Sequence, residues 1–411
     1  MNNSQNIPQG YKATALGIIP QEWEVKRIKD FGSVITGSTP STLDSENYGG
    51  RYMFVSPADL SEDAKYIITT EKTLSDKGYS QARRIPKGSI LFTCIGSTIG
   101  KIGIASQDLA TNQQINSVVT NGEYLFYALS FQSNRIRILA NEQAVPIINK
   151  SDFERIKVAF PPLAEQQKIA EVLGVWDEAI EKQARLTEKL ALRKRGLMQR
   201  LLSGQKRLHG FSGEWRKVEF SSVIEKISNG YVYDVNSIGS APITRIETVS
   251  KGFIDYTKVG YVRYVEELEK YKLREGDILF SHINSIAHIG KVAIFKGDKE
   301  LYHGMNLLLI RAKESMNKNY LYYFLSSIIA RRKVRSFAKQ AVNQASINTD
   351  ELKKWVICIP EVAEQNSIAE VLTAADREIE LAQQKLELLR QQKRGLMQQL
   401  LTGKKRVKYG N

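Results

Sequence analysis

The most regular hydrophobic pattern in the chain runs from Ala164 to Leu201, a stretch without proline in which mainly apolar residues recur at alternating steps of four and three. The positions are Ile169, Leu173, Trp176, Ile180, Gln183, Thr187, Leu190, Lys194, Leu197 and Leu201. Spacing of this kind, sustained over several heptads, predicts a coiled-coil helix and not an ordinary surface helix. At 1.5 Å per residue the predicted helix is about 55 Å long.

The same pattern returns near the end of the chain. PPLAEQQKIAEVLGVWDEAIE from Pro161 recurs as PEVAEQNSIAEVLTAADREIE from Pro360, and KRGLMQRLLSGQKR from Lys194 recurs as KRGLMQQLLTGKKR from Lys393. The second heptad series is Ile368, Leu372, Ala375, Ile379, Ala382, Leu386, Leu389, Lys393, Leu396 and Leu400. Weaker repeats precede both copies, such as KGSILF with EGDILF and TIGKIGIA with HIGKVAIF. The chain is therefore an internal duplication.

Charge indicates how the two helices pair. Each begins with acidic residues, among them Asp177 and Asp376, and ends with basic residues, among them Lys194 and Lys393. Parallel packing would place like charges together, whereas antiparallel packing places acid beside base, so we expect an antiparallel pair. Alternatively, acidic residues at the start and basic residues at the end of a helix stabilise its own dipole, and this explanation requires no partner helix.

The segments outside the helices contain short β-rich runs, such as SILFTCI and DILFSHI, and each segment also has an amphipathic helix, YLFYALSFQSNRIRILA or YLYYFLSSIIARRKVRSFA. Regular βαβ alternation is missing, which favours an α+β fold. The sequence predicts globular domains at 1–160 and 208–359, and coiled-coil helices at 161–207 and 360–411. Two globular domains separated by an antiparallel helix pair would be related by a pseudo-twofold axis.

Composition narrows the class of protein. Of the 411 residues, 42% are hydrophobic and 25% are charged, which is typical of soluble globular proteins. The first residues do not resemble a signal peptide and no apolar run could span a membrane, so we expect a cytoplasmic protein without membrane contact. Cys94 and Cys358 lie in apolar contexts and are predicted to be buried reduced thiols.

Motifs for catalysis are missing. Gly100-Lys101 and Gly290-Lys291 lack the remainder of a phosphate-binding loop. The Phe160-Pro161-Pro162 run differs from the active-site turn of amino-methyltransferases, because it has neither the amide or acid residue nor the aromatic residue of that turn. It is better explained as the end of a strand immediately before a helix. His282, His288 and His303 have no acid or thiol at ligand spacing. We therefore predict no catalytic residue and no metal site.

Signals for nucleic-acid binding are stronger. The formal net charge is +15, with basic residues concentrated between Arg331 and Lys339. Polar loops (TGSTPS, GSTIGK, TNQQIN and QAVNQASIN) supply the amides and hydroxyls that read base edges, although the same residues also stabilise turns. The predicted DNA-binding residues are Ser38, Thr39, Ser97, Thr98, Lys101 and Gln113 in the first globular part, and Tyr231, Tyr233, Arg245, Ser281, His282, Asn284, Arg332, Asn343 and Gln344 in the second.

The repeated helix motifs, together with the ITGSTPS loop and the GSTIGK turn, resemble the DNA specificity subunit of type I restriction-modification systems along essentially the whole chain. In the second copy the turn reads HINSIAHIGK and the TGSTPS loop has no clear counterpart, so individual contacts do not transfer. The resemblance implies a non-catalytic subunit, built of two target recognition domains and two conserved helices, that reads a bipartite, asymmetric sequence in double-stranded DNA.

The resemblance also implies partners. They would be two modification subunits, which carry S-adenosylmethionine and methylate adenine, and restriction subunits, which use ATP and Mg; this chain itself would bind no cofactor. The helix ends combine basic and apolar groups, and the predicted docking residues for the modification subunits are Leu197, Met198, Leu201, Leu396, Met397 and Leu400. The alternatives are that these residues only seal the helix pair, and that the chain is a protein-interaction scaffold with incidental basic charge.

Overall fold

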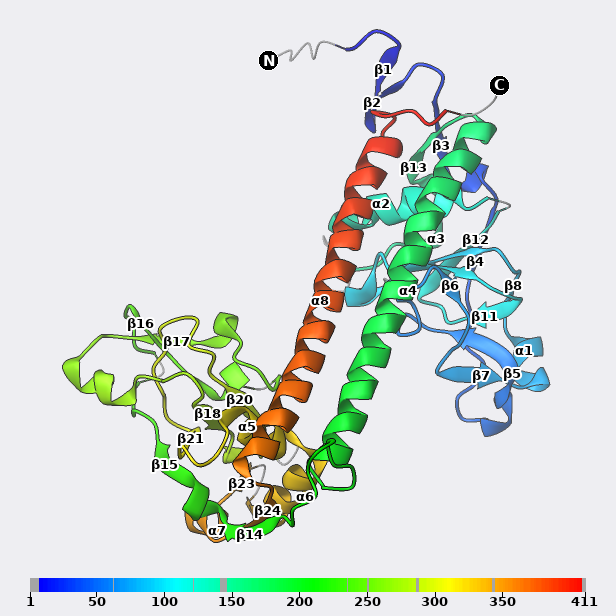
Figure 1. Cartoon of the computed structure of the whole chain (residues 1–411). Helices are drawn as coiled ribbons and strands as arrows, with labels where there is room; N and C mark the ends of the chain where they lie inside the picture. The colour runs from blue at the N-terminus through cyan, green and yellow to red at the C-terminus, as the bar shows by residue number, and fades with distance from the viewer. Residues whose placement is uncertain are drawn as a thin grey trace. The chain divides into compact units, whose positions relative to one another are not determined.

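The structure is a computed structural model that describes residues 7–61, 63–120, 122–140, 146–234, 236–249, 251–285, 288–341 and 344–408 (Figure 1). The chain divides into two compact units: unit 1 comprises residues 1–187 and 382–411, and unit 2 comprises residues 188–381. In the described part of the chain, no helix has the length and apolar character required to cross a bilayer.

The two longest helices are α4 (Leu163–Leu201) and α8 (Val362–Leu400), each of 39 residues. The boundary between the units falls inside both helices, so unit 1 contains the start of α4 with the end of α8, and unit 2 contains the converse halves. Each unit thus combines residues from both copies of the repeat. Antiparallel pairing accounts for this division, because it places the start of one helix beside the end of the other.

The antiparallel pairing itself agrees with the predicted charge pattern. In unit 1, Lys393 binds Asp177, and the Gln183 amide donates to the Ala382 carbonyl at 3.0 Å. In unit 2, Lys194 binds Asp376 at 2.5 Å. None of the predicted heptad residues is exposed, so the spacing correctly identified the inner face of each helix. Supercoiling of the pair stays a prediction.

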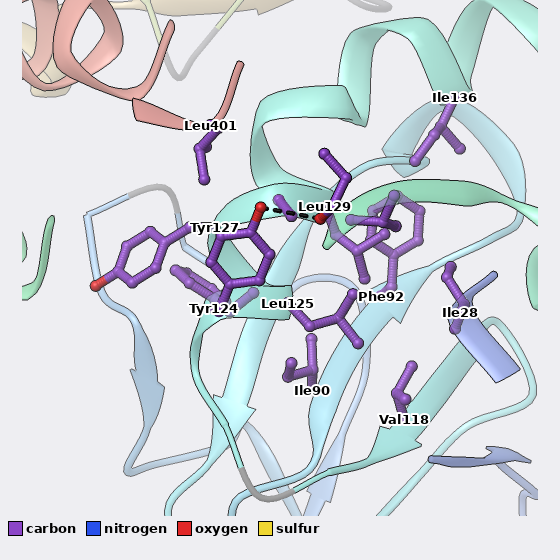
Figure 2. Close-up of a cluster of buried hydrophobic side chains, with 14 of the residues drawn as sticks. Ile28, Ile90, Phe92, Val118, Tyr124, Leu125, Tyr127, Leu129, Ile136 and Leu401 are labelled. Carbon is purple, nitrogen blue, oxygen red and sulfur yellow. Dashed lines mark hydrogen bonds between the residues drawn. The ribbon is translucent and has the colours of Figure 1, made fainter. Parts of the chain in front are cut away.

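Unit 1 contains a five-stranded sheet in the order β4, β12, β9, β10, β6. Its neighbouring strands are antiparallel, except for the parallel pair β10 and β6. The strands span, in sheet order, Ser33–Thr36, Ile115–Val119, Ile90–Thr93, Ile102–Ala105 and Tyr66–Ile67. Helix α2 (Tyr124–Ala140) contributes Leu125 and Leu129 to a buried cluster with Ile90, Phe92 and Val118 of the sheet (Figure 2).

A second sheet of unit 1 has the order β7, β5, β11, β8, and two further strand pairs join β1 to β2 and β3 to β13. A buried cluster with residues from both sheets, including Val55 and Leu91, shows that the sheets share a core. The bounds are β1 Tyr11–Thr14, β2 Gly17–Pro20, β3 Glu24–Arg27, β5 Tyr48–Val55, β7 Lys72–Leu74, β8 Arg84–Ile85, β11 Leu109–Thr111, β13 Lys157–Phe160, α1 Asp76–Gln81 and α3 Lys150–Arg155.

Unit 2 repeats the antiparallel part of the first sheet, in the order β15, β21, β18, β20. These strands correspond to β4, β12, β9 and β10 and span Ile224–Asn229, Leu308–Ala312, Ile278–Phe280 and Val292–Ile294. Smaller groups pair β14 with β24, β16 with β17, and β23 with β19 and β22. Their bounds are β14 Arg216–Glu219, β16 Ala241–Ile243, β17 Gly260–Val262, β19 Ile283–Asn284, β22 Lys339–Ala341, β23 Gln344–Ser346, β24 Val356–Ile359 and α7 Thr349–Lys353.

Two predictions on local structure were wrong. The amphipathic helix of the second globular part is interrupted at Ser327, which lies between α5 (Lys318–Ser326) and α6 (Ile328–Ser336). The backbone of Ser327 is extended, and its hydroxyl accepts a hydrogen bond from the Ala330 N–H as the N-cap of α6. Cys94 is buried as predicted, but Cys358 is exposed. The reason is that successive residues of β24 point to opposite faces, and only the face that carries Ile357 and Ile359 packs on the core.

A buried glutamate fixes the start of each long helix. In unit 1 the carboxylate of Glu165, which is fully buried, accepts two hydrogen bonds from Arg406, at 2.6 and 2.9 Å, and one from the Trp23 indole, also at 2.9 Å. Unit 2 repeats the arrangement with Glu364, Arg207 and Trp215. In both units the arginine follows the end of the other copy's helix, so each copy anchors the other.

Candidate nucleic-acid interface

Three polar loops of unit 1 leave the same end of the five-stranded sheet. Strands β4 and β9 end there, at Thr36 and Thr93, while β12 and β10 begin there. The register confirms this arrangement, because Asn116 pairs with Thr36 and Ile115 pairs with Thr93. The loops at 37–40, 94–101 and 112–114 therefore form one rim, and they contain all six residues predicted for this part of the chain.

The first and third loops of this rim are joined directly. The Thr39 hydroxyl donates to the Gln113 side-chain oxygen at 2.6 Å, and the Ser38 N–H donates to the Thr111 carbonyl at 2.9 Å. Gly37 makes this approach possible, because a Cβ atom there would lie 2.1 Å from the Asn112 carbonyl oxygen. Thr39 and Gln113 are exposed and Ser38 is half-buried. The structure thus brings three of the predicted residues into one polar cluster.

The second loop lies next to the third, since the Cys94 N–H donates to the Gln114 carbonyl at 2.8 Å. Ser97 is exposed and Thr98 is half-buried, at the end of a short 3₁₀ turn. The Lys101 ammonium donates to the Pro57 carbonyl at 3.0 Å, which orients its half-buried side chain. No described side-chain hydrogen bond joins these three residues to Thr39 or Gln113.

Sequence reasoning missed Arg83, whose backbone N–H donates to the Ser38 hydroxyl at 2.9 Å and whose guanidinium donates to the Thr36 carbonyl at 3.0 Å. Arg83 is exposed and comes from the segment before β8, so only the fold brings it to the rim. The adjacent basic pair Arg83-Arg84 was the only signal in the sequence, and such pairs are common on protein surfaces.

Unit 2 has the same arrangement at the corresponding end of its sheet. Strands β15 and β18 end at Asn229 and Phe280, and both lie opposite Leu308, the first residue of β21. The segment after β15 carries Tyr231 and Tyr233, and the loop between β18 and β20 carries Ser281, His282 and Asn284. Five of the predicted residues of this unit are therefore placed at equivalent strand ends.

The loop between β18 and β20 holds two buried residues and one accessible residue. Ser281 and His282 are 1% and 7% exposed, whereas Asn284 is half-buried and donates from its amide to the Ser281 hydroxyl at 3.1 Å. Burial lowers the pKa of His282 to about 4, so its imidazole is neutral near pH 7. Asn284 is therefore partly accessible to solvent, whereas Ser281 and His282 are largely buried.

Tyr231, Tyr233 and Arg245 form a second group in unit 2. The Tyr231 ring packs edge-on against Tyr271, and the Tyr233 hydroxyl donates to the Thr244 carbonyl at 3.3 Å. Burial raises the pKa of Tyr233, and its hydrogen bond with the Arg245 guanidinium acts in the opposite direction. All three side chains are half-buried, so each presents one edge to solvent.

The basic helix α6 lies beside the loop between β18 and β20. Val334 packs so closely on Gly290 that a Cβ atom at the glycine would lie 2.8 Å from the valine side chain. Arg332, on the same helix, is exposed, and its contact with a phosphate stays a prediction. Asn343 lies outside the described residues. Gln344 begins β23, which pairs with β19, but its side chain is also outside the description.

The predicted docking residues are less accessible than expected. Leu201, Met397 and Leu400 are 1%, 6% and 2% exposed and belong to the cores of their units, which is the burial expected of residues that seal the helix pair. Leu197, Met198 and Leu396 are half-buried against the same cores. Residues that follow each helix, such as Leu202 and Leu401, complete these cores, and this explains the burial.

Two further histidines, His288 and His303, make local contacts. His303 is buried and faces the Leu307 carbonyl at 3.1 Å, and the His288 ring lies 3.0 Å from the Lys291 ammonium. Across the ranges that the structure describes, no group of three or more His, Cys, Asp or Glu side chains could hold a metal ion.

Comparison with known proteins gives a consistent result. Residues 20–190 and 213–391 match the family model described as "Type I restriction modification DNA specificity domain". Over 195 residues the chain is 45% identical to the putative type I restriction enzyme MjaX specificity subunit of Methanocaldococcus jannaschii. This match covers 46% of this chain and 46% of that protein, which is about half of each. The chain is 27% identical to the MjaVIII specificity subunit of the same organism over 95% of this chain and 94% of that one.

Among solved structures, the type I restriction-modification S subunit from M. genitalium is similar with a TM-score of 0.58 and 14% identity, over 98% of both chains. A chain from a study of type I restriction-modification complex assembly gives a TM-score of 0.55 at 14% identity, covering 94% of this chain and 99% of that one. At this identity the likeness concerns the fold alone.

Proposed function

The chain belongs to the type I restriction-modification DNA specificity family, and we propose that its two units read the two halves of one bipartite, asymmetric DNA target. The observation that carries this proposal is the repeated arrangement of polar loops at equivalent strand ends of the two sheets. Each unit thereby has one rim of donors and acceptors that are at least partly accessible, held at the ends of its strands.

The chemistry of these rims suits DNA. Amide and hydroxyl groups such as those of Gln113 and Thr39 can pair with base edges, and exposed cations such as Arg332 can neutralise phosphates. The formal charge of +15 supports association with a polyanion.

Differences between the rims support an asymmetric target. Unit 1 presents Thr39, Gln113 and Arg83, whereas the corresponding loops of unit 2 present Asn284 and the tyrosines after β15. Because base readout depends on the individual side chains, two rims with different side chains select different half-sites.

The helix pair would set the gap between the half-sites. A helix of 39 residues is about 58 Å long, which exceeds the roughly 34 Å between successive major-groove faces on one side of B-DNA. We propose that the length of α4 and α8 fixes the number of base pairs between the half-sites.

The names of its relatives support a role within a larger enzyme. We propose that the chain has no catalytic activity and binds no cofactor itself, and that it works in the cytoplasm. It would bind two modification subunits, which supply S-adenosylmethionine chemistry, and restriction subunits, which use ATP and Mg. Half-buried Leu197, Met198 and Leu396 remain candidate docking residues, since part of each side chain is accessible.

A salt titration of DNA binding tests the central proposal. The chain, assembled with its modification subunits, is titrated with duplexes that contain or lack the motif found in the methylome of its host. A specificity subunit gives affinity that falls steeply with salt and retains a preference for the motif. Binding without any sequence preference, or no binding, would favour the protein-interaction scaffold.

A further inference from the structure

Arg83 is held at the rim of unit 1 by two contacts made to one loop. Its N–H donates to the Ser38 hydroxyl at 2.9 Å, and one terminal nitrogen of its guanidinium donates to the Thr36 carbonyl at 3.0 Å. Its neighbours Ala82 and Ile85 are buried, which anchors the segment on both sides. The arginine side chain is nevertheless exposed, so it is positioned and also accessible.

Arg83 keeps most of its donors free although its side chain is held at the rim. A guanidinium has five N–H donors, and the bond to Thr36 uses one of them. Arg51 and Arg390 are paired with Asp76 and Asp63, but among the residues that the structure describes no carboxylate lies within ion-pair distance of Arg83. The positive charge and most of the planar fork therefore stay available for a ligand.

Gln113 occupies the other side of the same loop, where its side-chain oxygen accepts from Thr39. The four residues from Thr36 to Thr39 thus bind the guanidinium of Arg83 and the side-chain amide of Gln113. These two groups are the standard bidentate partners of guanine O6 and N7 and of adenine N6 and N7 in the major groove. A pre-positioned arginine also loses less conformational entropy when it binds.

We propose that Arg83 reads a guanine in the half-site that unit 1 recognises. This inference rests on the proposed function, since it assigns one base of the target to one side chain. A phosphate contact weakens all sequences alike, whereas guanine readout acts at one position of the target. A lysine in this position keeps the charge but loses the planar fork of N–H donors, so it adds a second test of the two roles.

The experiment selects DNA from a randomised duplex library with the full-length chain in complex with its modification subunits. The variants are Arg83→Lys, Arg83→Gln and Arg83→Ala. Arg84→Lys is the matched control, because Arg84 is an equally exposed neighbour whose guanidinium lies over Tyr79. None of these changes removes the backbone bond to Ser38, and equal thermal unfolding of the variants and the parent verifies the fold.

We expect the selected motif to contain one position at which all three Arg83 variants lose the preference for guanine. The loss should be about 5- to 150-fold in relative affinity, while the other positions and the second half-site stay unchanged. Arg84→Lys should leave the motif intact. An unchanged motif would overturn the assignment. So would a uniform loss of affinity for all sequences in Arg83→Ala that Arg83→Lys restores. If the parent complex itself selects no motif, the proposed function fails and not merely this inference.

Discussion

The Lys393 ammonium nitrogen lies 2.5 Å from one carboxylate oxygen of Asp177, and the Tyr127 hydroxyl donates to the other oxygen at the same distance. Lys393 belongs to α8, Asp177 to α4 and Tyr127 to α2, so this carboxylate connects the helix pair to the helix that covers the first sheet. Burial raises the pKa of Tyr127, which keeps its proton available for the bond. Unit 2 has the same triad in Lys194, Asp376 and Tyr323.

Replacing Asp177 with Asn should destabilise unit 1, because the Lys393 side chain, 14% exposed, would lose its counterion. We expect a loss of about 3 kcal/mol in the free energy of unfolding. The double variant Asp177→Asn with Lys393→Met should recover most of it, since no buried charge remains unpaired. Urea denaturation measures each value.

The pair Arg193–Glu378 provides the control for this cycle, because both its side chains are about half exposed, at 55% and 48%. Glu378→Gln should change stability by less than about 1 kcal/mol. If the losses of stability from the single Asp177 and Lys393 variants simply added up in the double variant, the triad would not act as a unit.

Replacing Glu165 with Gln should loosen the C-terminal segment of unit 1. The buried carboxylate binds Arg406 and Trp23, and an amide of the same shape can accept only part of these hydrogen bonds. We expect faster amide hydrogen exchange in residues 401–408, measured by mass spectrometry, and no change in unit 2. Glu364→Gln is the matched variant and should instead loosen the segment around Arg207 and Trp215. If either variant increased hydrogen exchange in both units, the two glutamates would not anchor their units independently.

Long-range regularity made the helices predictable from sequence. The heptad spacing and the repeat placed the first helix at Ala164 to Leu201, close to the observed Leu163–Leu201. The charge pattern gave the antiparallel direction, because charge at a helix end does not depend on the rest of the fold. The composition of the units was not predictable in this way, since the boundary inside α4 and α8 arises only from packing.

Features that depend on tertiary neighbours escaped the sequence. Cys358 was expected to be buried because its segment is apolar, yet only the alternate residues Ile357 and Ile359 of β24 face the core. Loop composition selected Ser38, Thr39 and Gln113, which the structure places together. Arg83 comes from the segment before β8 and reaches them only in the folded chain. The burial of Leu201, Met397 and Leu400 depends on the chain that follows each helix.

Unit 2 should be the more acid-sensitive part of the protein. All four histidines lie between residues 209 and 303, in unit 2, and burial lowers the pKa of both His282 and His303 to about 4. The unfolded chain, with a histidine pKa near 6.5, binds more protons between pH 6.5 and 4, so stability falls as pH decreases through this window. From pH 7 to pH 5 the loss should be about 2 kcal/mol per histidine.

Hydrogen exchange at pH 7 and pH 5 should therefore show opening in the peptides of unit 2 before those of unit 1. His282→Asn should reduce the difference between the two pH values. The exposed His209 provides the control, and its replacement should have no effect. Equal sensitivity of unit 1 would point to carboxylates instead.

Shortening both helices by one heptad tests the helix pair as a spacer. Residues 183–189 and 382–388 are removed together, because Gln183 and Ala382 face each other and the remaining contacts keep their register. Seven residues correspond to about 10 Å of helix, so we expect the gap in the target to shorten by up to about three base pairs. The methylome gives the gap directly, and both half-sites should be unchanged. An unaltered gap would show that the helix length does not set the spacing.

Arg332 and Asn284 should differ in the kind of DNA contact they make. Arg332 is an exposed cation on α6, so Arg332→Ala should weaken specific and random DNA alike and lower the slope of log affinity against log salt by about one. Asn284 is a half-buried amide fixed by its bond to the Ser281 hydroxyl, so Asn284→Ala should cost about 1 to 3 kcal/mol on the specific site and relax one position of the second half-site. Fluorescence anisotropy at several salt concentrations, with one specific and one random duplex, measures both effects. A loss for Asn284→Ala that is equal on the two duplexes would show that this loop positions the protein on the DNA backbone and does not read bases.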